Sequence, residues 1–390
     1  MASADSTNQT AAWKRLDGID LLRGLAIFFV LMNHINIRLL GAKVPYLKFL
    51  PEQLAHFLVW NGQLGVHMFF VVSGFLITSM SLRRSDALTR ISVRDFYLLR
   101  FARIGPLLLL LLAVLTALHL AKIDDFVVPA KTGGLGRALL AALTFHVNVL
   151  EATQGYLPAK WDILWSLSVE EMFYLFFPLV CWLSGSRRFL VPILLIFVVL
   201  GPFSRTVFAH GNEVWEEYSY LGGMEAIALG CLTALLASVR FSVRSLWVVG
   251  ACGAATVSLS LIFSWQAYLG WPARTGLNMT ILALGTCMFI AATAQAQWKS
   301  PRILAPLLGL GKHSYEVYLT HVRRLRVLRL ICVSRQATAP RAYFVHCRHP
   351  DGGFSGPFNC HYPLGAGESI STEPIWKQNA VEVRKVESSR

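Results

Sequence analysis

Nine apolar stretches, each long enough to cross a lipid bilayer, constrain this sequence more than any other feature. A membrane-spanning helix needs about 20 predominantly apolar residues, and a chain that offers so many cannot bury them all inside one soluble globule. We therefore expect an all-α, polytopic transmembrane helical bundle. The predicted spans cover residues 19–40, 56–80, 104–121, 163–183, 189–209, 220–238, 245–264, 277–296 and 303–322.

Composition and charge agree with a membrane protein. Of 390 residues, 55% are hydrophobic and only 15% are charged, and the mean hydropathy is +0.51. The net charge of +14 lies in short basic clusters between the apolar runs, which is typical of cytoplasmic loops and not of a nucleic-acid-binding surface. These clusters share one side of the membrane only if the short apolar stretch 137–150 does not cross. We therefore predict that 137–150 is a re-entrant or interfacial helix and that the N-terminus is cytoplasmic.

The pattern divides the chain into three segments: a polar tail over 1–14, a membrane-embedded domain over 15–322 and a basic tail over 323–390. Four arginines between positions 323 and 329 end the last apolar run, and the tail carries 11 basic and 5 acidic side chains. Because its composition shows no sustained periodicity, we predict disorder; binding to anionic lipid is the alternative. A shifted reading frame or a truncated and replaced C-terminus would produce such a tail.

Two ionisable side chains, Arg23 and His34, lie within the first predicted span, eleven residues apart. Eleven residues make about three helical turns, so both side chains share one face and are separated by roughly 16–17 Å along the axis. Ionisable residues inside a membrane are costly and are candidates for function. The alternatives are an arginine that reaches the interface and a histidine hydrogen-bonded to a neighbouring carbonyl.

Five short motifs follow one another along the predicted membrane domain. The first is Arg23, ten residues and His34; the others are GVHMFFVVSGFLIT at 65–78, FYLLRFARIGP at 96–106, WSLSVEEMFY at 165–174 and SYEVYLTH at 314–321. Together they resemble the integral-membrane acyltransferase family 3, which includes O-acetyltransferases of bacterial surface polysaccharides and acyltransferases of macrolides. The resemblance covers residues 15–322, about four-fifths of the chain.

This resemblance implies transfer of an acyl group, in the first instance acetyl, from acyl-coenzyme A to a hydroxyl of a carbohydrate or glycoside, as in O-acetylation of cell-surface polysaccharides. The implied partners are the lipid bilayer and that acceptor, the implied location is the bacterial inner membrane, and neither a metal nor nucleic acid is expected. A transporter or flippase with an intramembrane Arg/His/Glu path is the alternative. Internal repeats, which are common in transporters, are not evident in the sequence.

Arg100 and Arg103 stand three residues apart and so face the same side of a helix. Planar guanidinium groups bind phosphate in bidentate fashion, and the resemblance makes the phosphates of acyl-coenzyme A their ligand. Positive-inside topology is the alternative.

Under the resemblance, His34 deprotonates the acceptor hydroxyl or carries the acyl group itself. Arg23 holds the thioester or phosphate end of the donor or stabilises a developing oxyanion.

Two adjacent carboxylates, Glu170 and Glu171, belong to the fourth motif. The resemblance implies a functional acid in this motif, with Glu170 as the first candidate and Glu171 as the second. Such an acid would orient an imidazole. A capping box formed by Ser168 and Glu171 at a helix start is the alternative. In the second motif, Ser73 and Gly74 are expected to serve close helix packing.

Overall fold

A computed structural model describes residues 15–319, apart from short gaps at 42–43, 45, 86–87, 124, 185, 238 and 265–269. The described residues form α-helices joined by loops and short 3₁₀ turns, and none of them lies in a β-strand. The predicted tails, 1–14 and 323–390, lie outside them. The helices are α1 (Asp17–Gly41), α2 (Glu52–Val59), α3 (Gly62–Ser85), α4 (Val93–Leu120), α5 (Gly134–Leu143), α6 (Val147–Gln154), α7 (Ala159–Asp162), α8 (Leu164–Leu183), α9 (Arg187–Arg205), α10 (Glu213–Tyr218), α11 (Tyr220–Leu236), α12 (Val243–Ile262), α14 (Trp271–Arg274), α15 (Leu277–Gln295) and α16 (Ala305–Lys312).

Within the described part of the chain, seven helical stretches are long and apolar enough to cross a membrane. They confirm the predicted class, a polytopic helical membrane protein, although nine spans were expected. These stretches are Asp17–Gly41, Glu52–Ser85, Val93–Leu120, Leu164–Leu183, Glu213–Leu236, Val243–Ile262 and Leu277–Gln295.

Two predicted spans are not among these seven. The apolar part of α9, Phe189–Arg205, is shorter than the others. The expected span 303–322 is interrupted: α16 ends at Lys312, His313 is a turn, and residues 314–319 are helical again. Glycines at 309 and 311 precede this turn and weaken a helix.

The predicted re-entrant segment 137–150 consists of two short helices and not of one. Phe145, with a φ of 57°, lies in the left-handed region between α5 and α6, and that conformation ends a right-handed helix. The ten residues of α5 and the eight of α6 correspond to about 15 and 12 Å. Neither helix is long enough to cross a bilayer alone, as the sequence predicted.

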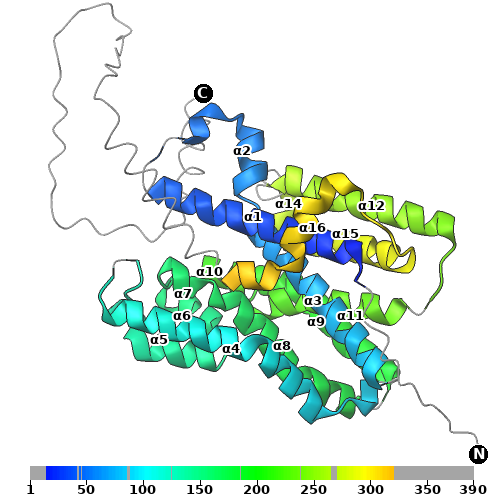
Figure 1. Cartoon of the computed structure of the whole chain (residues 1–390), viewed down its shortest axis with the longest axis horizontal. Helices are drawn as coiled ribbons and strands as arrows, with labels where there is room; N and C mark the ends of the chain where they lie inside the picture. The colour runs from blue at the N-terminus through cyan, green and yellow to red at the C-terminus, as the bar shows by residue number, and fades with distance from the viewer. Residues whose placement is uncertain are drawn as a thin grey trace, which may run out of the picture. The chain divides into compact units, whose positions relative to one another are not determined.

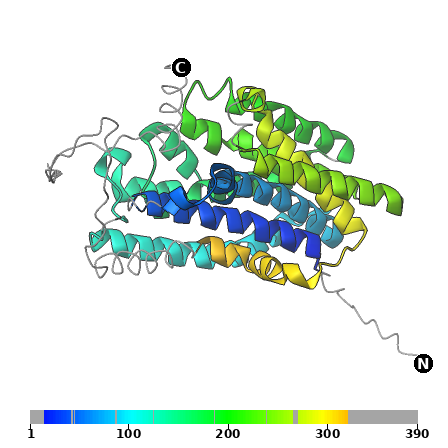
Figure 2. The ribbon, with the colours of Figure 1, turned by 90° about the horizontal axis from the view of Figure 1, so that it is seen from above.

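Helix α3 contacts α1, α8, α11 and α15 (Figure 1). Glycines bring it unusually close to α11: a Cβ on Gly74 would lie 1.9 Å from the Ile227 carbonyl oxygen, and one on Gly230 would lie 2.0 Å from that of Val71. The packing role expected for Gly74 is therefore confirmed. Helix α1 lies beside α3 and α16 (Figure 2).

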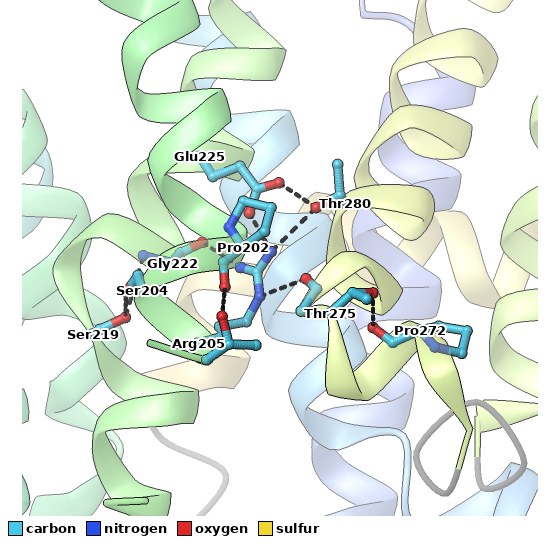
Figure 3. Close-up of polar contacts among 11 residues, drawn as sticks. Pro202, Ser204, Arg205, Ser219, Gly222, Glu225, Pro272, Thr275 and Thr280 are labelled. Atoms are coloured by element: carbon cyan, nitrogen blue, oxygen red, sulfur yellow. Dashed lines mark hydrogen bonds and ion pairs between the residues drawn. The ribbon is translucent and has the colours of Figure 1, made fainter. Parts of the chain in front are cut away.

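A buried ion pair joins α9, α11 and α15 (Figure 3). Arg205, the last residue of α9, donates from Nε to the Gly276 carbonyl at 3.0 Å and from Nη1 to the Gly222 carbonyl at 3.2 Å. Its Nη2 donates to the Glu225 carboxylate and to Thr280 Oγ1, and Thr280 in turn donates to Glu225. Each guanidinium nitrogen thus has a partner, and three helices are tied together at one point.

Candidate active site

A cavity of about 540 Å³ lies among α1, α3, α4, α8 and helical residues 314–319. Along α3 its lining extends from Val66 to Ser85. Nineteen residues of helix measure about 28 Å, close to the hydrocarbon thickness of about 30 Å. The cavity therefore follows α3 over nearly the full depth of a membrane. Its charged lining residues are Arg23, Arg84, Arg90, Asp95, Arg100, Arg103 and Glu170.

The two ends of this cavity differ in chemistry. Arg84 and Arg90 line it near the C-terminal end of α3, whereas Val66 and Phe69 line it near the start of that helix. Tyr318 also lies at the apolar end, where its ring meets that of Phe69 edge-on at 6.3 Å. Its hydroxyl is 2.6 Å from Ser166 Oγ. The arginine end thus suits an anion, and the apolar end suits an uncharged group.

The middle of the cavity holds a hydroxyl and a carboxylate. Ser73 Oγ, on α3, donates a hydrogen bond of 2.6 Å to Glu170 Oε1, on α8. Both side chains line the cavity and are half-buried. The sequence indicated only a packing role for Ser73, because a serine next to glycine in an apolar helix is typical of close helix contacts. Only the packing of α3 against α8 shows that Ser73 faces Glu170.

Arg100 and Arg103, for which the sequence predicted donor binding, both line the cavity. The Arg100 guanidinium lies over the Tyr174 ring, 3.5 Å from its centroid, a cation–π contact. Its Nε is buried without a hydrogen-bond partner among the described residues. Because an unsatisfied buried donor is costly, this N–H is suited to receive an oxygen of an anionic ligand.

Arg23 donates from Nε to Ser314 Oγ at 3.0 Å, and its Nη1 lies 4.0 Å from Asp20. It lines the main cavity and also a second cavity of about 420 Å³. The second cavity is strongly cationic, since Glu316 is the only acidic side chain among the described residues that line it. Two of its cations, Arg15 and Lys312, gave no functional signal in the sequence, because isolated basic residues beside a span are typical of topology. The cations of this second cavity are Arg15, Arg23, Arg103 and Lys312.

The capping alternative for Ser168 and Glu171 is wrong. Helix α8 begins at Leu164, so both residues lie inside it. Ser168 Oγ donates to the Leu164 carbonyl at 3.0 Å and accepts from the Val147 N–H at 3.2 Å, so it joins α6 to α8. Glu171 does not line the main cavity, and its Oε1 is buried without a partner among the described residues.

His34 does not line the main cavity. Its position follows from the contact of α1 with α3, where a Cβ on Gly65 would lie 2.6 Å from the Ala26 carbonyl oxygen and 3.3 Å from Val30. The apolar end at Val66 is therefore level with Ala26 to Val30, and His34 lies four residues, about 6 Å, further along α1. The structure groups Arg23, Arg100, Arg103 and Glu170 in one cavity and places His34 beyond its apolar end.

Comparison with known proteins gives the family. The family described as "Acyltransferase domain" matches residues 16–331. The chain belongs to this acyltransferase family. The chain is 27% identical over 322 residues to the O-acetyltransferase OatA of Staphylococcus aureus strain NCTC 8325 / PS 47, over 78% of this chain and 50% of OatA. OatA of strain COL gives the same values. The chain thus spans about half the length of these curated relatives, and no solved structure matches it.

The resemblance read from the five motifs is thereby confirmed, and the apolar helices make this member of the family an integral membrane protein. Each motif supplies a residue to the main cavity: Arg23, Ser73, Arg100, Glu170 and Tyr318. Segments far apart in sequence therefore meet at one place. Within the described part of the chain, no group of three or more His, Cys, Asp or Glu side chains is placed to hold a metal ion.

Proposed function

We propose that this protein transfers an acyl group from acyl-coenzyme A to a hydroxyl of a carbohydrate or glycoside at the bacterial inner membrane. The acyl group is proposed to be acetyl. One observation carries the proposal: a single cavity connects a cluster of arginines to an apolar end that lies one helical turn from His34. An acyl donor has the same polarity, with phosphates at one end and an uncharged acyl group at the other. The relatives are named O-acetyltransferases, which supports acetyl transfer to oxygen.

The donor phosphates are proposed to bind Arg100 and Arg103. The residues fit this role because the buried Nε of Arg100 lacks a partner among the described residues and because guanidinium groups bind phosphate oxygens in pairs. The cationic second cavity, which shares Arg103 and Arg23 with the main one, offers further positive charge through Arg15 and Lys312. By the positive-inside rule this end faces the cytoplasm, together with the N-terminus.

His34 is proposed to remove the proton of the acceptor hydroxyl. The hydroxyl oxygen then attacks the thioester carbon, the carbon–sulfur bond breaks, and the imidazolium gives its proton to the leaving thiolate. Arg23 lies on the same helix about 16–17 Å away and is proposed to hold the donor. Glu170 is proposed to be the functional acid inside the cavity. Glu171, its neighbour in sequence, is proposed to support Glu170.

Purified protein in lipid nanodiscs tests this function. With acetyl-coenzyme A we expect release of free thiol that increases when an acceptor glycan is added, together with a mass gain of one acetyl group on that glycan. In cells, mass spectrometry of surface glycans should show O-acetyl groups that disappear when the gene is deleted. Folded protein that releases no thiol and leaves glycans unchanged, but moves a solute across the membrane of sealed lipid vesicles, would contradict the proposal and indicate transport.

A further inference from the structure

Arg100 is held in a different way from Arg23 and Arg205. Those two arginines donate hydrogen bonds to oxygen atoms of other segments of the chain. Arg100 makes neither a hydrogen bond nor an ion pair with the described residues, and its guanidinium lies over the Tyr174 ring, 3.5 Å from the ring centroid. An aromatic face on α8 therefore supports this cation, where oxygen atoms support the other two.

The distance between Arg100 and Tyr174 defines how the two groups meet. The guanidinium carbon lies 3.5 Å from the ring centroid, which is van der Waals contact for carbon at about 3.5–4.0 Å. If an N–H pointed at the ring, this carbon would lie further away, by up to the length of a C–N bond, about 1.3 Å. The guanidinium plane therefore faces the ring. All the N–H groups lie in that plane, so stacking leaves them free to bind a ligand at the edge.

Two carboxylates compete for the Arg100 guanidinium. Arg100 lies within electrostatic range of Glu170 and Glu171, yet it forms no ion pair with either. Tyr174 follows Glu170 by four residues on α8, so its ring shares a helix face with that carboxylate. Direct pairing would engage the N–H groups with carboxylate oxygens. Stacking on the ring keeps the cation beside the carboxylates and leaves its N–H groups unused.

The Tyr174 ring is itself fixed by packing. Its side chain is buried, and its hydroxyl lies beside Ser73 of α3. One turn away, Phe96 of α4 stacks on Phe177 of α8, with ring centroids 6.1 Å apart and an angle of 28° between the ring planes. This second aromatic contact sets α4 against α8 close to the arginine. The ring is therefore a rigid support, and a group held on a rigid support loses little entropy when it binds a ligand.

We propose that Tyr174 is a positioning residue, whose ring holds the Arg100 guanidinium off the neighbouring carboxylates and directs its N–H groups to a phosphate of the donor. The buried Nε of Arg100, which lacks a partner among the described residues, is one of these groups. The proposal rests on the proposed function and deepens it, since it explains how one donor-binding arginine stays available. It assigns a role to a residue of the fourth motif for which the sequence indicated none.

Fluorination of the ring tests this contact with little change in shape. Fluorine withdraws electrons and so weakens the attraction of the ring face for a cation. We expect the KM for acetyl-coenzyme A to rise when Tyr174 is replaced in turn with phenylalanine, 3,5-difluorophenylalanine and 3,4,5-trifluorophenylalanine. The rise across the series should reach about fivefold or more, with kcat nearly constant because the contact affects donor binding. A KM that stays constant across folded members of the series overturns the proposal.

Ordinary variants separate the ring from its hydroxyl. Tyr174→Leu removes the ring and should raise the KM for acetyl-coenzyme A by about five- to thirtyfold. Tyr174→Phe loses only the contact beside Ser73 and should restore a KM close to that of the wild type. If Tyr174→Leu does not fold, the fluorinated series decides. A KM that rises equally in the Phe and Leu variants would assign the effect to the hydroxyl and would overturn the proposal.

Tyr97→Leu is the matched control for the loss of a tyrosine between α4 and α8. The Tyr97 hydroxyl donates to the Leu175 carbonyl of α8, but Tyr97 does not line the cavity. This variant should keep the wild-type KM for acetyl-coenzyme A. An increase as large as that in Tyr174→Leu would show that helix packing, and not the support of Arg100, sets the KM, and would contradict the proposal.

A double variant shows whether Tyr174 acts through Arg100. In an Arg100→Ala background, Tyr174→Leu should add no further increase in the KM for acetyl-coenzyme A, whereas independent effects would multiply. Small donors that lack phosphate, S-acetylpantetheine and S-acetyl-N-acetylcysteamine, should show the same KM in the wild type and in Tyr174→Leu. Multiplying effects in the double variant, or an equal loss with the small donors, would overturn the positioning role.

The same measurements separate this proposal from the proposed function. Wild-type protein that releases thiol from acetyl-coenzyme A, together with a constant KM across the fluorinated series, contradicts only the role of Tyr174. Folded wild-type protein that releases thiol from none of these donors contradicts the proposed function and, with it, the role of Tyr174.

Discussion

Two groups of charged side chains lie between the packed helices, and they differ in how completely their hydrogen bonds are satisfied. In the Arg205–Glu225–Thr280 cluster, each guanidinium nitrogen has a partner on the neighbouring helices (Figure 3). In the main cavity, Arg100 Nε lacks a partner among the described residues, and Ser73 and Glu170 face open space. A buried charged group whose hydrogen bonds are all satisfied holds helices together. A buried charged group with an unsatisfied hydrogen-bond donor or acceptor is available to a ligand.

The largest expected effect is on stability, in the satisfied cluster. Arg205→Ala leaves the Glu225 carboxylate buried without its cation, and breaking a buried pair in this way costs about 3–5 kcal/mol. We expect a markedly lower melting temperature of the purified protein in detergent. Replacing both partners with apolar residues, Arg205→Met with Glu225→Leu, should recover much of the loss. An Arg205→Ala protein that melts like the wild type would show that this cluster is not a structural tie.

His34→Ala should have the opposite profile, with loss of activity and normal stability. Removing a general base lowers the rate by about 10²–10⁴-fold, while the change from imidazole to methyl removes a polar load from α1. We expect unchanged melting and a strongly reduced kcat for acetyl transfer to the acceptor. If turnover persists at the wild-type rate, His34 has no part in the mechanism.

Arg100→Ala together with Arg103→Ala should raise the KM for acetyl-coenzyme A. Charge-assisted contacts to phosphate contribute about 1.5–3 kcal/mol each, so an increase of about tenfold or more is expected, with little change for the small donors that lack phosphate. Arg244→Ala, an exposed cation at the start of α12, is the control. Equal KM values in the double variant and the control would mean that Arg100 and Arg103 serve topology only.

Glu170→Gln and Glu171→Gln test whether two adjacent carboxylates have different roles. Glu170 accepts from Ser73 in the cavity, and its change to Gln should reduce kcat/KM for acetyl-coenzyme A by about tenfold. Glu171 has a buried oxygen without a partner among the described residues, so its neutralisation should not lower the melting temperature. Because Glu171 does not line the cavity, Glu171→Gln should reduce activity less than Glu170→Gln does. A silent Glu170→Gln with a severe Glu171→Gln would reverse the assignment.

The smallest effect concerns an acidic pair outside the spans, Glu151 and Asp162. Burial raises the pKa of Glu151 well above its usual value, and the Asp162 charge raises it further. Burial also raises the pKa of Asp162, to about 7. In the unfolded chain both carboxyls have pKa values of about 4, so the folded state binds their protons more tightly. The free energy of unfolding therefore falls as pH rises from about 4 through 7. The melting temperature should be lower at about pH 8 than at about pH 5.5, and Glu151→Gln should flatten this dependence.

Local sequence was sufficient for the class of fold and for part of the cavity. Runs of about 20 apolar residues leave no alternative to membrane helices, and guanidinium groups at intramembrane or juxtamembrane positions indicate ligand binding before any contact is known. Arg23, Arg100, Arg103 and Glu170, chosen from the sequence, all line one cavity. Their convergence was expected only because the motifs resemble a family.

Tertiary structure decided how these residues are arranged and which others join them. Periodicity within one helix cannot show that Ser73 faces Glu170, since a hydrogen bond between residues 97 positions apart depends on how α3 packs against α8. It likewise cannot show that Arg205 and Glu225 are mutually satisfied. The same limit explains the capping box wrongly considered for Ser168 and Glu171: the spacing is correct, but α8 begins at Leu164. Spacing along a chain determines which side chains lie on the same face of a helix. Which atoms lie opposite that face is determined only when helices distant in sequence pack together.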